Sequence, residues 1–422
     1  MKKEVLGGRK NWRLVVASCV AGLLILLIAH FVLVGGFVGN SQMLSNGALE
    51  PNIVAQTNGQ TTGNVNLFNG RVPSLSWIVG RDCLNGMTVY LQHAATNPDA
   101  ALVGTGWLDP TSGQLINGQS NNCVPGSLSM DAAISLVHQH GGKVYLTIAM
   151  ETDGTSSSWT TAQQTAYVVK ASATPGYINP ILHEVERASY DGVIMDLEGT
   201  DNSYSGIQQT FATYNQQLWH ALQPLHKLYG IALIHKTSDH DEYYGLNGFE
   251  NWNLLGKSAD FLVVMAVDQS YWTPGPSVSV PWLQQLLTYV MQTMPQMLPH
   301  IIWELPLYGN SWHQENGKWV FDGIVDYQNA MGSVDAASLS QIDATQSNVQ
   351  DGYQPHLVYT DASNVIHSLW FMNAQSLHNI IHDFQQLLRK EPHFSTGSLQ
   401  FAVWWRTTAE PPGFWDKVDM LY

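Results

Sequence analysis

Downstream of residue 72, short apolar runs alternate with longer segments in which apolar residues recur at helical spacing. Apolar runs of this length, bounded by turn-forming residues, are typical of strands buried in a parallel sheet. Eight such runs, alternating with helical patterning, predict an α/β fold of the (β/α)8 type, the TIM barrel. The runs cover residues 76–80, 101–108, 143–149, 191–197, 230–235, 260–267, 300–306 and 399–405.

The segments between these runs are amphipathic, and they predict the helices that surround the barrel. We expect helices over residues 130–140, 207–228, 281–294 and 374–388, with Ser129 as the N-terminal cap of the first. Between the seventh strand and its helix, about residues 310–372 contain further strand-like runs and turn residues. This segment predicts a small α+β insertion beside the barrel mouth.

The chain begins with a pattern that differs from the rest. Residues 1–13 are basic, residues 14–38 are almost wholly apolar, and residues 39–71 are rich in Asn, Gln, Gly and Thr. The apolar run is long enough to cross a bilayer, so we expect a cytoplasmic tail, a transmembrane signal anchor and a flexible linker before a catalytic barrel at 72–422. The prediction is a single-pass protein of the cell membrane with its folded domain outside. The alternative is a cleaved signal peptide and a secreted protein.

The balance of acidic and basic residues excludes one class of binding partner. The chain holds 18 Lys and Arg residues and 33 Asp and Glu residues. Five of the basic residues and one acid lie within residues 1–13, so the remainder has 13 basic and 32 acidic residues, a net charge of −19. Binding to phosphate backbones rests on Lys and Arg, so this balance excludes a nucleic-acid partner.

Two cysteines, Cys83 and Cys123, follow the predicted membrane segment. In an exported protein they could form a disulfide, and two buried free thiols are the alternative. Cysteine and histidine spacing matches no metal motif, so we expect neither a metal nor another cofactor.

The fourth predicted strand carries the clearest chemical signal, in the segment DGVIMDLE at 191–198. Strand alternation places Asp196 and Glu198 on the same face as Ile194, towards the inside of the barrel. Two carboxylates in one enclosed space raise the pKa of one of them, which makes a protonated acid available near neutral pH. The alternative is a salt-bridged pair at the barrel rim, although few basic residues exist to form one.

This segment resembles the D-G-x-D-x-D-x-E signature of glycoside hydrolase family 18, the chitinases and related N-acetylglucosaminidases. Further segments resemble motifs of the branch that acts on spore and cell-wall glycans, and they occur in the same order. Together the likeness spans about residues 75–420. The segments are MAVD at 265–268, PGP at 274–276 with PW at 281–282, LPLYG at 305–309 and WWR at 404–406.

The resemblance implies a substrate-assisted, retaining mechanism. In it Glu198 is the general acid, the 2-acetamido group of the substrate is the nucleophile, and Asp196 holds the acetamido N–H. The implied partner is an N-acetylglucosamine-containing polysaccharide, with peptidoglycan favoured over chitin because the anchor holds the domain near the wall. The implied substrate-binding residues are Asp268, Met265, Tyr308, Trp405 and Asp191.

Three residues depart from the family pattern. Ile194 replaces an acidic or amide residue, Val267 replaces a tyrosine, and Glu304 replaces a glycine. The first two changes remove polar partners of the reacting groups, and Glu304 either adds a carboxylate to the site or pairs with a basic group. Two functions therefore follow: a glycosidase, or a glycan-binding protein that has lost turnover.

Overall fold

The computed structural model describes most of the chain downstream of residue 73. The predicted tail, membrane segment and linker lie outside the described residues, as do the side chains of Cys83 and Cys123. No helix among the residues it describes is long and apolar enough to span a membrane. The described ranges are 74–79, 83–95, 99–109, 112–116, 122–123, 128–149, 160–336, 354–361, 363–394, 400–404 and 410–419.

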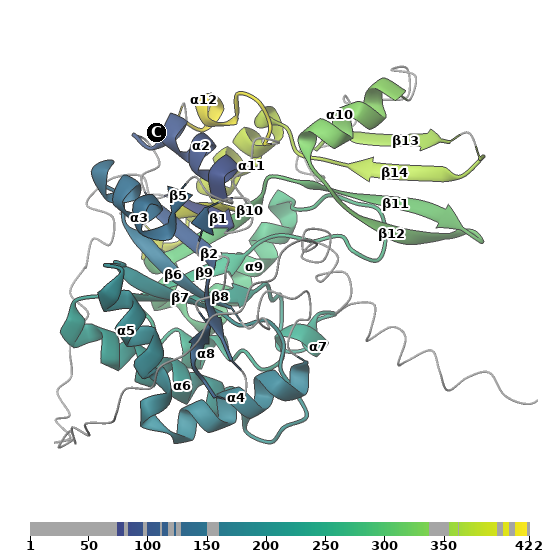
Figure 1. Ribbon diagram of the computed structural model, residues 1–422. Helices are drawn as coiled ribbons and strands as arrows, with labels where there is room; N and C mark the ends of the chain where they lie inside the picture. The colour runs from purple at the N-terminus through teal and green to yellow at the C-terminus, as the bar shows by residue number, and fades with distance from the viewer. Residues whose placement is uncertain are drawn as a thin grey trace, which may run out of the picture.

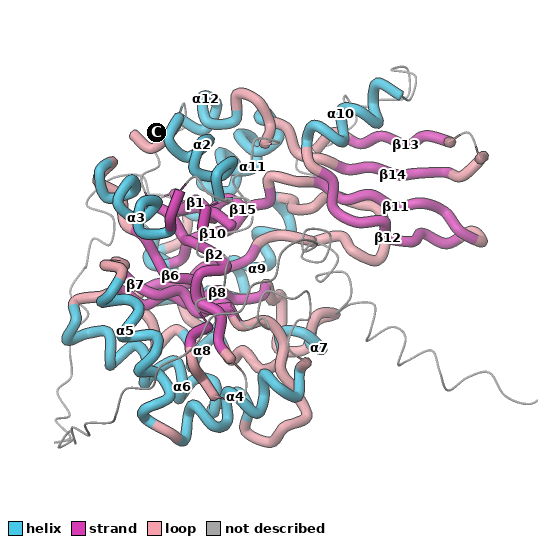
Figure 2. Tube along the Cα trace, viewed as in Figure 1, coloured by secondary structure: helices cyan, strands magenta, loops and turns pink. Residues whose placement is uncertain are grey.

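Eight parallel strands form a closed barrel (Figures 1 and 2). Each strand pairs with its neighbours in the order β1-β2-β6-β7-β8-β9-β10-β15, and the β1–β15 pairing completes the ring. The predicted (β/α)8 barrel is therefore confirmed. The strands are β1 (Ser74–Val79), β2 (Asp99–Leu108), β6 (Val144–Ala149), β7 (Gly192–Asp196), β8 (Leu228–Ile234), β9 (Phe261–Met265), β10 (Ile301–Pro306) and β15 (Gln400–Trp404).

Helices surround this barrel, as the cyan segments of Figure 2 show. One predicted boundary was wrong. The helix expected over residues 207–228 ends at Leu222, because Pro224 lacks the N–H that a continuing helix needs and a short 3-10 turn follows. The longer helices are α2 (Cys83–His93), α3 (Met130–Gln139), α4 (Thr161–Ala173), α5 (Asn179–Arg187), α6 (Ile207–Leu222), α9 (Val280–Thr293) and α11 (Ala374–Leu388).

Strand alternation divides the core into an outer and an inner layer. On β7, Val193 and Met195 pack in the large cluster between strands and helices, whereas Ile194 packs inside the barrel. The inner cluster is much smaller and includes Trp77, Tyr145 and Phe261. Since Asp196 follows Ile194 by two residues, the same alternation directs it into the barrel.

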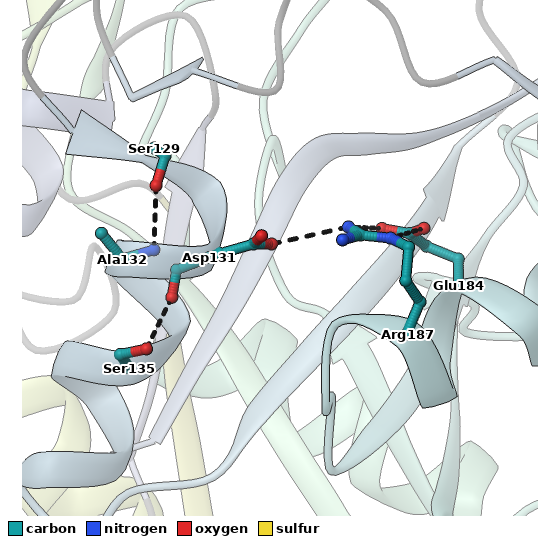
Figure 3. Close-up of polar contacts among 6 residues, drawn as sticks. All are labelled: Ser129, Asp131, Ala132, Ser135, Glu184 and Arg187. Atoms are coloured by element: carbon teal, nitrogen blue, oxygen red, sulfur yellow. Dashed lines mark hydrogen bonds and ion pairs between the residues drawn. The ribbon is translucent and has the colours of Figure 1, made fainter.

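Two of the outer helices are joined by polar contacts at their ends (Figure 3). Ser129 accepts a hydrogen bond of 3.2 Å from the backbone N–H of Ala132, which confirms it as the cap of α3. On α5, Arg187 donates two hydrogen bonds to Glu184, at 2.8 and 2.7 Å, and approaches Asp131 of α3 at 3.5 Å. Among the contacts drawn, the one between Arg187 and Asp131 connects α5 to α3 outside the barrel.

A separate four-stranded antiparallel sheet follows β10 and extends away from the barrel (Figure 1). Its order is β12-β11-β14-β13, with bounds β11 (Gly309–Glu315), β12 (Lys318–Val325), β13 (His356–Thr360) and β14 (Ile366–Trp370). Helix α10 (Tyr327–Ala336) lies beside it. A Cβ at Gly309 would lie 1.9 Å from the carbonyl oxygen of Trp370, so only glycine lets β11 approach β14 here.

Candidate active site

The centre of the candidate site is the C-terminal end of β7. Asp196 is the last residue of this strand and pairs with Ala149 of β6, while Glu198 lies two residues further along. Burial raises the pKa of Asp196 to about 6. Its Oδ1 atom is buried and has no hydrogen-bond partner within the described structure. Asp196 therefore lies at the end of the barrel where reactive residues of this fold lie, and Glu198 follows it there.

A second carboxylate, Asp268, lies just beyond β9 and accepts a hydrogen bond from a tyrosine just beyond β10. The Tyr308 hydroxyl donates a hydrogen bond of 3.0 Å to Oδ1 of Asp268. Asp268 has a φ of 57°, a left-handed backbone conformation uncommon outside glycine. The hydroxyl of Tyr243 donates to its backbone carbonyl at 3.0 Å, which supports this conformation. Burial raises the pKa of the Asp268 carboxyl, and the hydrogen bonds from Tyr308 and Asn310 oppose the rise.

The loop that follows Asp268 is fixed by the small sheet. From β11, Asn310 donates to the carbonyl of Ser270 at 3.2 Å, and the Trp312 indole donates to the carbonyl of Tyr271 at 2.9 Å. The Tyr271 ring also packs against Phe321 of β12, with ring centres 4.5 Å apart. The small sheet therefore positions one wall of the barrel mouth.

Glu304 of β10 belongs to the site and not to a surface ion pair. Its side chain is only 3% exposed, and it takes part in none of the ion pairs found among the described residues. Burial raises its pKa well above the usual range, and the charges of Asp196, Glu198 and Asp268 raise it further. Four carboxyl groups therefore interact in one enclosed space.

The remaining predicted residues are placed differently. Met265 ends β9, packs against the inner cluster and pairs in register with Glu304. Trp405 lies outside the described residues. Trp404, the residue before it, packs against the inner cluster and meets Trp77 edge-on at 5.7 Å between ring centres.

The structure does not bring Asp191 to the carboxylate group. Asp191 lies at the opposite end of β7, where its Oδ2 atom accepts a hydrogen bond of 2.8 Å from the backbone N–H of Val144 and contacts His138 at 2.8 Å. Asp99 and Asp260 accept backbone N–H groups from neighbouring segments in the same way. These aspartates stabilise the N-terminal ends of the strands, far along the barrel axis from Glu198.

Sequence reasoning missed three residues that shape the site: Tyr243, Asn310 and Trp404. The alternation on β15 could have identified Trp404, since Ala402 and Trp404 share the inner face. No sequence signal indicated Tyr243 or Asn310, because both act through backbone carbonyls of a distant loop.

A buried lysine and a further buried glutamate lie beside these carboxylates. Lys236, two residues beyond β8, is buried and donates a hydrogen bond of 2.5 Å to the backbone carbonyl of Glu250. Burial raises the pKa of Glu250 to about 8, and the charge of Asp196 adds to the rise. No group of three or more metal-binding side chains occurs in the part of the chain that the structure describes.

Solved structures with the same fold are chitinases and related enzymes. A chitinase from Chromobacterium violaceum matches with a TM-score of 0.65 and 18% identity, over 82% of this chain and 98% of that one. The spore cortex-lytic enzyme SleL of Bacillus cereus matches with a TM-score of 0.64 and 16% identity, over 83% of this chain and 74% of that one. A class V chitinase from Pseudomonas fluorescens matches with a TM-score of 0.64 and 17% identity, over 82% of this chain and 98% of that one.

No protein-family model matches the sequence, and no curated protein matches it. At these identities the structural likeness establishes the fold, and it agrees with the likeness expected from the motifs at the strand ends. The chain therefore has the barrel fold of chitinases and spore cortex-lytic enzymes, with four interacting carboxyl groups inside.

Proposed function

We propose that this protein is a glycoside hydrolase of the family 18 type that cleaves β-1,4-linked N-acetylglucosamine-containing glycans. One observation carries the proposal: Asp196 ends β7, Glu198 follows two residues later, and the charges of both, with that of Asp268, act on the buried Glu304. The charges of Glu198 and Asp268 also act on Tyr308. The fold shared with chitinases and with SleL supports it.

The proposed mechanism follows from the positions of these groups. Glu198 protonates the glycosidic oxygen, and the carbonyl oxygen of the substrate's 2-acetamido group attacks the anomeric carbon. The Asp196 carboxylate accepts the acetamido N–H and stabilises the positive oxazolinium intermediate. Glu198, now ionised, removes a proton from the water that opens this intermediate, so the anomeric configuration is retained.

The favoured substrate is peptidoglycan, because the predicted anchor would hold the barrel beside the cell wall. An exposed aromatic residue beside the mouth suits a long glycan. Trp272 lies four residues beyond Asp268, is 55% exposed, and packs edge-on against Tyr271 at 4.8 Å. A flat ring held in this way can stack on a sugar face outside the reacting centre.

The test is turnover of the full-length protein on peptidoglycan and on chitooligosaccharides, followed by the release of reducing ends. Glu198→Gln removes the proton and keeps the shape, so we expect a loss of about 10²–10⁴-fold with unchanged thermal unfolding. Glu186→Gln, on the exposed side of α5, is the matched control and should retain parental activity. A Glu198→Gln variant as active as the parent would reject the mechanism.

A non-catalytic glycan-binding protein is the second candidate, because two inner positions are apolar. Ile194 is fully buried beneath Asp196, and Val267 precedes Asp268 where the resemblance calls for tyrosine. Glycan binding without the release of any reducing ends would favour this candidate. The choice between peptidoglycan and chitin follows from the same assay.

A further inference from the structure

The proposed mechanism does not use Glu304, although this residue lies at the centre of the barrel. Glu304 pairs in register with Met265 on one side and with Ala402 on the other, and both neighbours pack in the inner cluster. Its carboxyl group therefore projects into the barrel interior and away from the surrounding helices. A carboxyl group buried in this way is costly unless it remains neutral or has a partner.

Strand register places Glu304 in a layer of four side chains. Because barrel strands tilt, side chains at one height come from alternate strands. The register assigns Trp77 of β1, Thr147 of β6 and Ala232 of β8 to the layer of Glu304. This layer is unusually polar for the inside of a small barrel. The Trp77 Nε1 and Thr147 Oγ1 atoms are buried, and neither has a hydrogen-bond partner within the described structure.

The next layer towards the barrel mouth contains Asp196, Met265 and Trp404. The Oδ1 atom of Asp196 is buried and lacks a hydrogen-bond partner among the described residues. Below Asp196 on its own strand lies Ile194, which cannot donate a hydrogen bond. A donor for this oxygen cannot come from Ile194, and the polar layer beneath it offers one from another strand.

The environment of Glu304 determines whether its carboxyl group can donate a hydrogen bond. Burial raises the pKa of Glu304 well above its usual range, and the charges of Asp196, Glu198 and Asp268 act in the same direction. The Trp77 indole N–H opposes the rise, but among the described residues its geometry falls short of a full hydrogen bond. Burial and the neighbouring charges thus favour the neutral carboxylic acid form of Glu304, which has one O–H to donate.

We propose that Glu304 is a positioning residue that donates a hydrogen bond, directly or through one enclosed water, to the buried Oδ1 atom of Asp196. The donor from β10 replaces the polar partner that Ile194 cannot provide. It holds Asp196 ionised and oriented while its other oxygen receives the acetamido N–H. This role rests on the proposed function, whereas the protonated state of Glu304 and its contact with Asp196 do not.

Other charged groups lie around Glu304 and Asp196 and bear on the test. They are Glu198 at the end of its own strand, Asp268 beyond β9, and Glu250 with Lys236 beyond β8. A change in Glu304 alone must therefore be compared with a change in a polar neighbour of the same layer. Thr147→Val provides that comparison, because it removes a hydroxyl without changing the size of the side chain.

The kinetic test uses Glu304→Gln and Glu304→Leu in the full-length protein. Gln keeps an N–H donor, so its kcat and pH profile should remain near those of the parent. Leu removes the donor, so kcat should fall on the order of 10²-fold while KM changes little. Losing a hydrogen bond to the ionised form raises the pKa of Asp196, so the acid limb of kcat should move to higher pH in Glu304→Leu alone.

The spectroscopic test does not depend on turnover. The infrared difference between the parent and Glu304→Gln at pH 7 should contain the carbonyl stretch of a protonated carboxylic acid. Asp196→Asn should shift that band, because it replaces a charged acceptor with a neutral one, and Thr147→Val should not. A shift in a protein that cleaves no glycan would uphold the contact and reject only the proposed function.

Three results would overturn the inference. The first is the absence of the carboxylic acid band, which would mean that Glu304 is ionised. The second is a band that Asp196→Asn leaves in place. The third is a Thr147→Val variant that reproduces the kinetic loss and the shifted acid limb of Glu304→Leu, which would assign the donor to Thr147. If Glu304→Leu does not fold, the two infrared measurements decide.

Discussion

The Tyr308 hydroxyl donates a hydrogen bond of 3.0 Å to the Asp268 carboxylate and so joins the ends of two neighbouring barrel strands. Asp268 lies three residues beyond β9, and Tyr308 lies two residues beyond β10. Both side chains are held in place by their backbones: Asp268 by the Tyr243 hydroxyl, and Tyr308 by the small sheet that begins at Gly309. The pair is therefore preorganised for a ligand before one arrives.

Removing this hydrogen bond should weaken catalysis without unfolding the barrel. Tyr308→Phe deletes the donor that lowers the pKa of Asp268, so this pKa should rise and the carboxylate should form only at higher pH. We expect kcat/KM on N-acetylglucosamine glycans to fall roughly 10–10²-fold at pH 6, with partial recovery as the pH rises. Steady-state kinetics across pH 4–9 measure both effects.

The control for this change is Tyr167→Phe. Tyr167 shares a buried hydroxyl contact of 3.1 Å with Tyr214 on the helices outside the barrel. This variant should lose stability but keep the parental pH profile. If the pH profile shifts equally in both variants, the shift comes from a general loss of stability and not from the pKa of Asp268.

Asp196 should make stability depend on pH. Its pKa is about 6 in the folded protein, against about 3.9 in an unfolded chain. Between these values the folded state binds more protons, so the free energy of unfolding decreases as pH rises from 4 to 6. In Asp196→Asn this contribution is absent. The change in the free energy of unfolding over this pH range should therefore differ between the two proteins by on the order of 2 kcal/mol. Urea unfolding at pH 4 and pH 7 measures it, with the exposed Asp416→Asn as control; parallel curves for parent and Asp196→Asn would contradict the assignment.

A substitution at Val267 tests whether the site lacks one hydrogen-bond donor that would position the acetamido group. If it does, Val267→Tyr should raise kcat on acetamido sugars, because the added hydroxyl orients the carbonyl that attacks. The gain should disappear on substrates without the N-acetyl group. An active parent with no gain in the variant would mean that another group, such as Tyr308, already supplies this contact.

The predicted membrane anchor can be tested on intact cells. Protease added outside should digest the barrel, while a tag placed within residues 1–13 stays protected, because the basic residues hold that end inside. A tag placed after Tyr422 should be lost. Recovery of a soluble protein that starts near residue 40 would instead establish a cleaved signal peptide.

Much of the barrel could be read from local pattern. The strand runs predicted from apolar residues overlap all eight barrel strands, and alternation alone assigned Asp196 to the inward face that it shares with Ile194. The apolar period continues past Leu222 and predicts a longer helix, whereas Pro224 ends it there. The small sheet was anticipated from its strand-like runs, but its contacts with the loop beyond Asp268 were not.

The sequence alone determined which residues face the barrel interior, because the side-chain period of a strand depends only on its own backbone. It left the role of Glu304 open and placed Asp191 among the substrate-binding residues. Only the closed barrel decided these points, since the height of a side chain depends on the register and tilt of strands that are distant in sequence. That geometry brings Glu304 of β10 beneath Asp196 of β7, and it leaves Asp191 at the opposite end, where its carboxylate accepts the Val144 N–H.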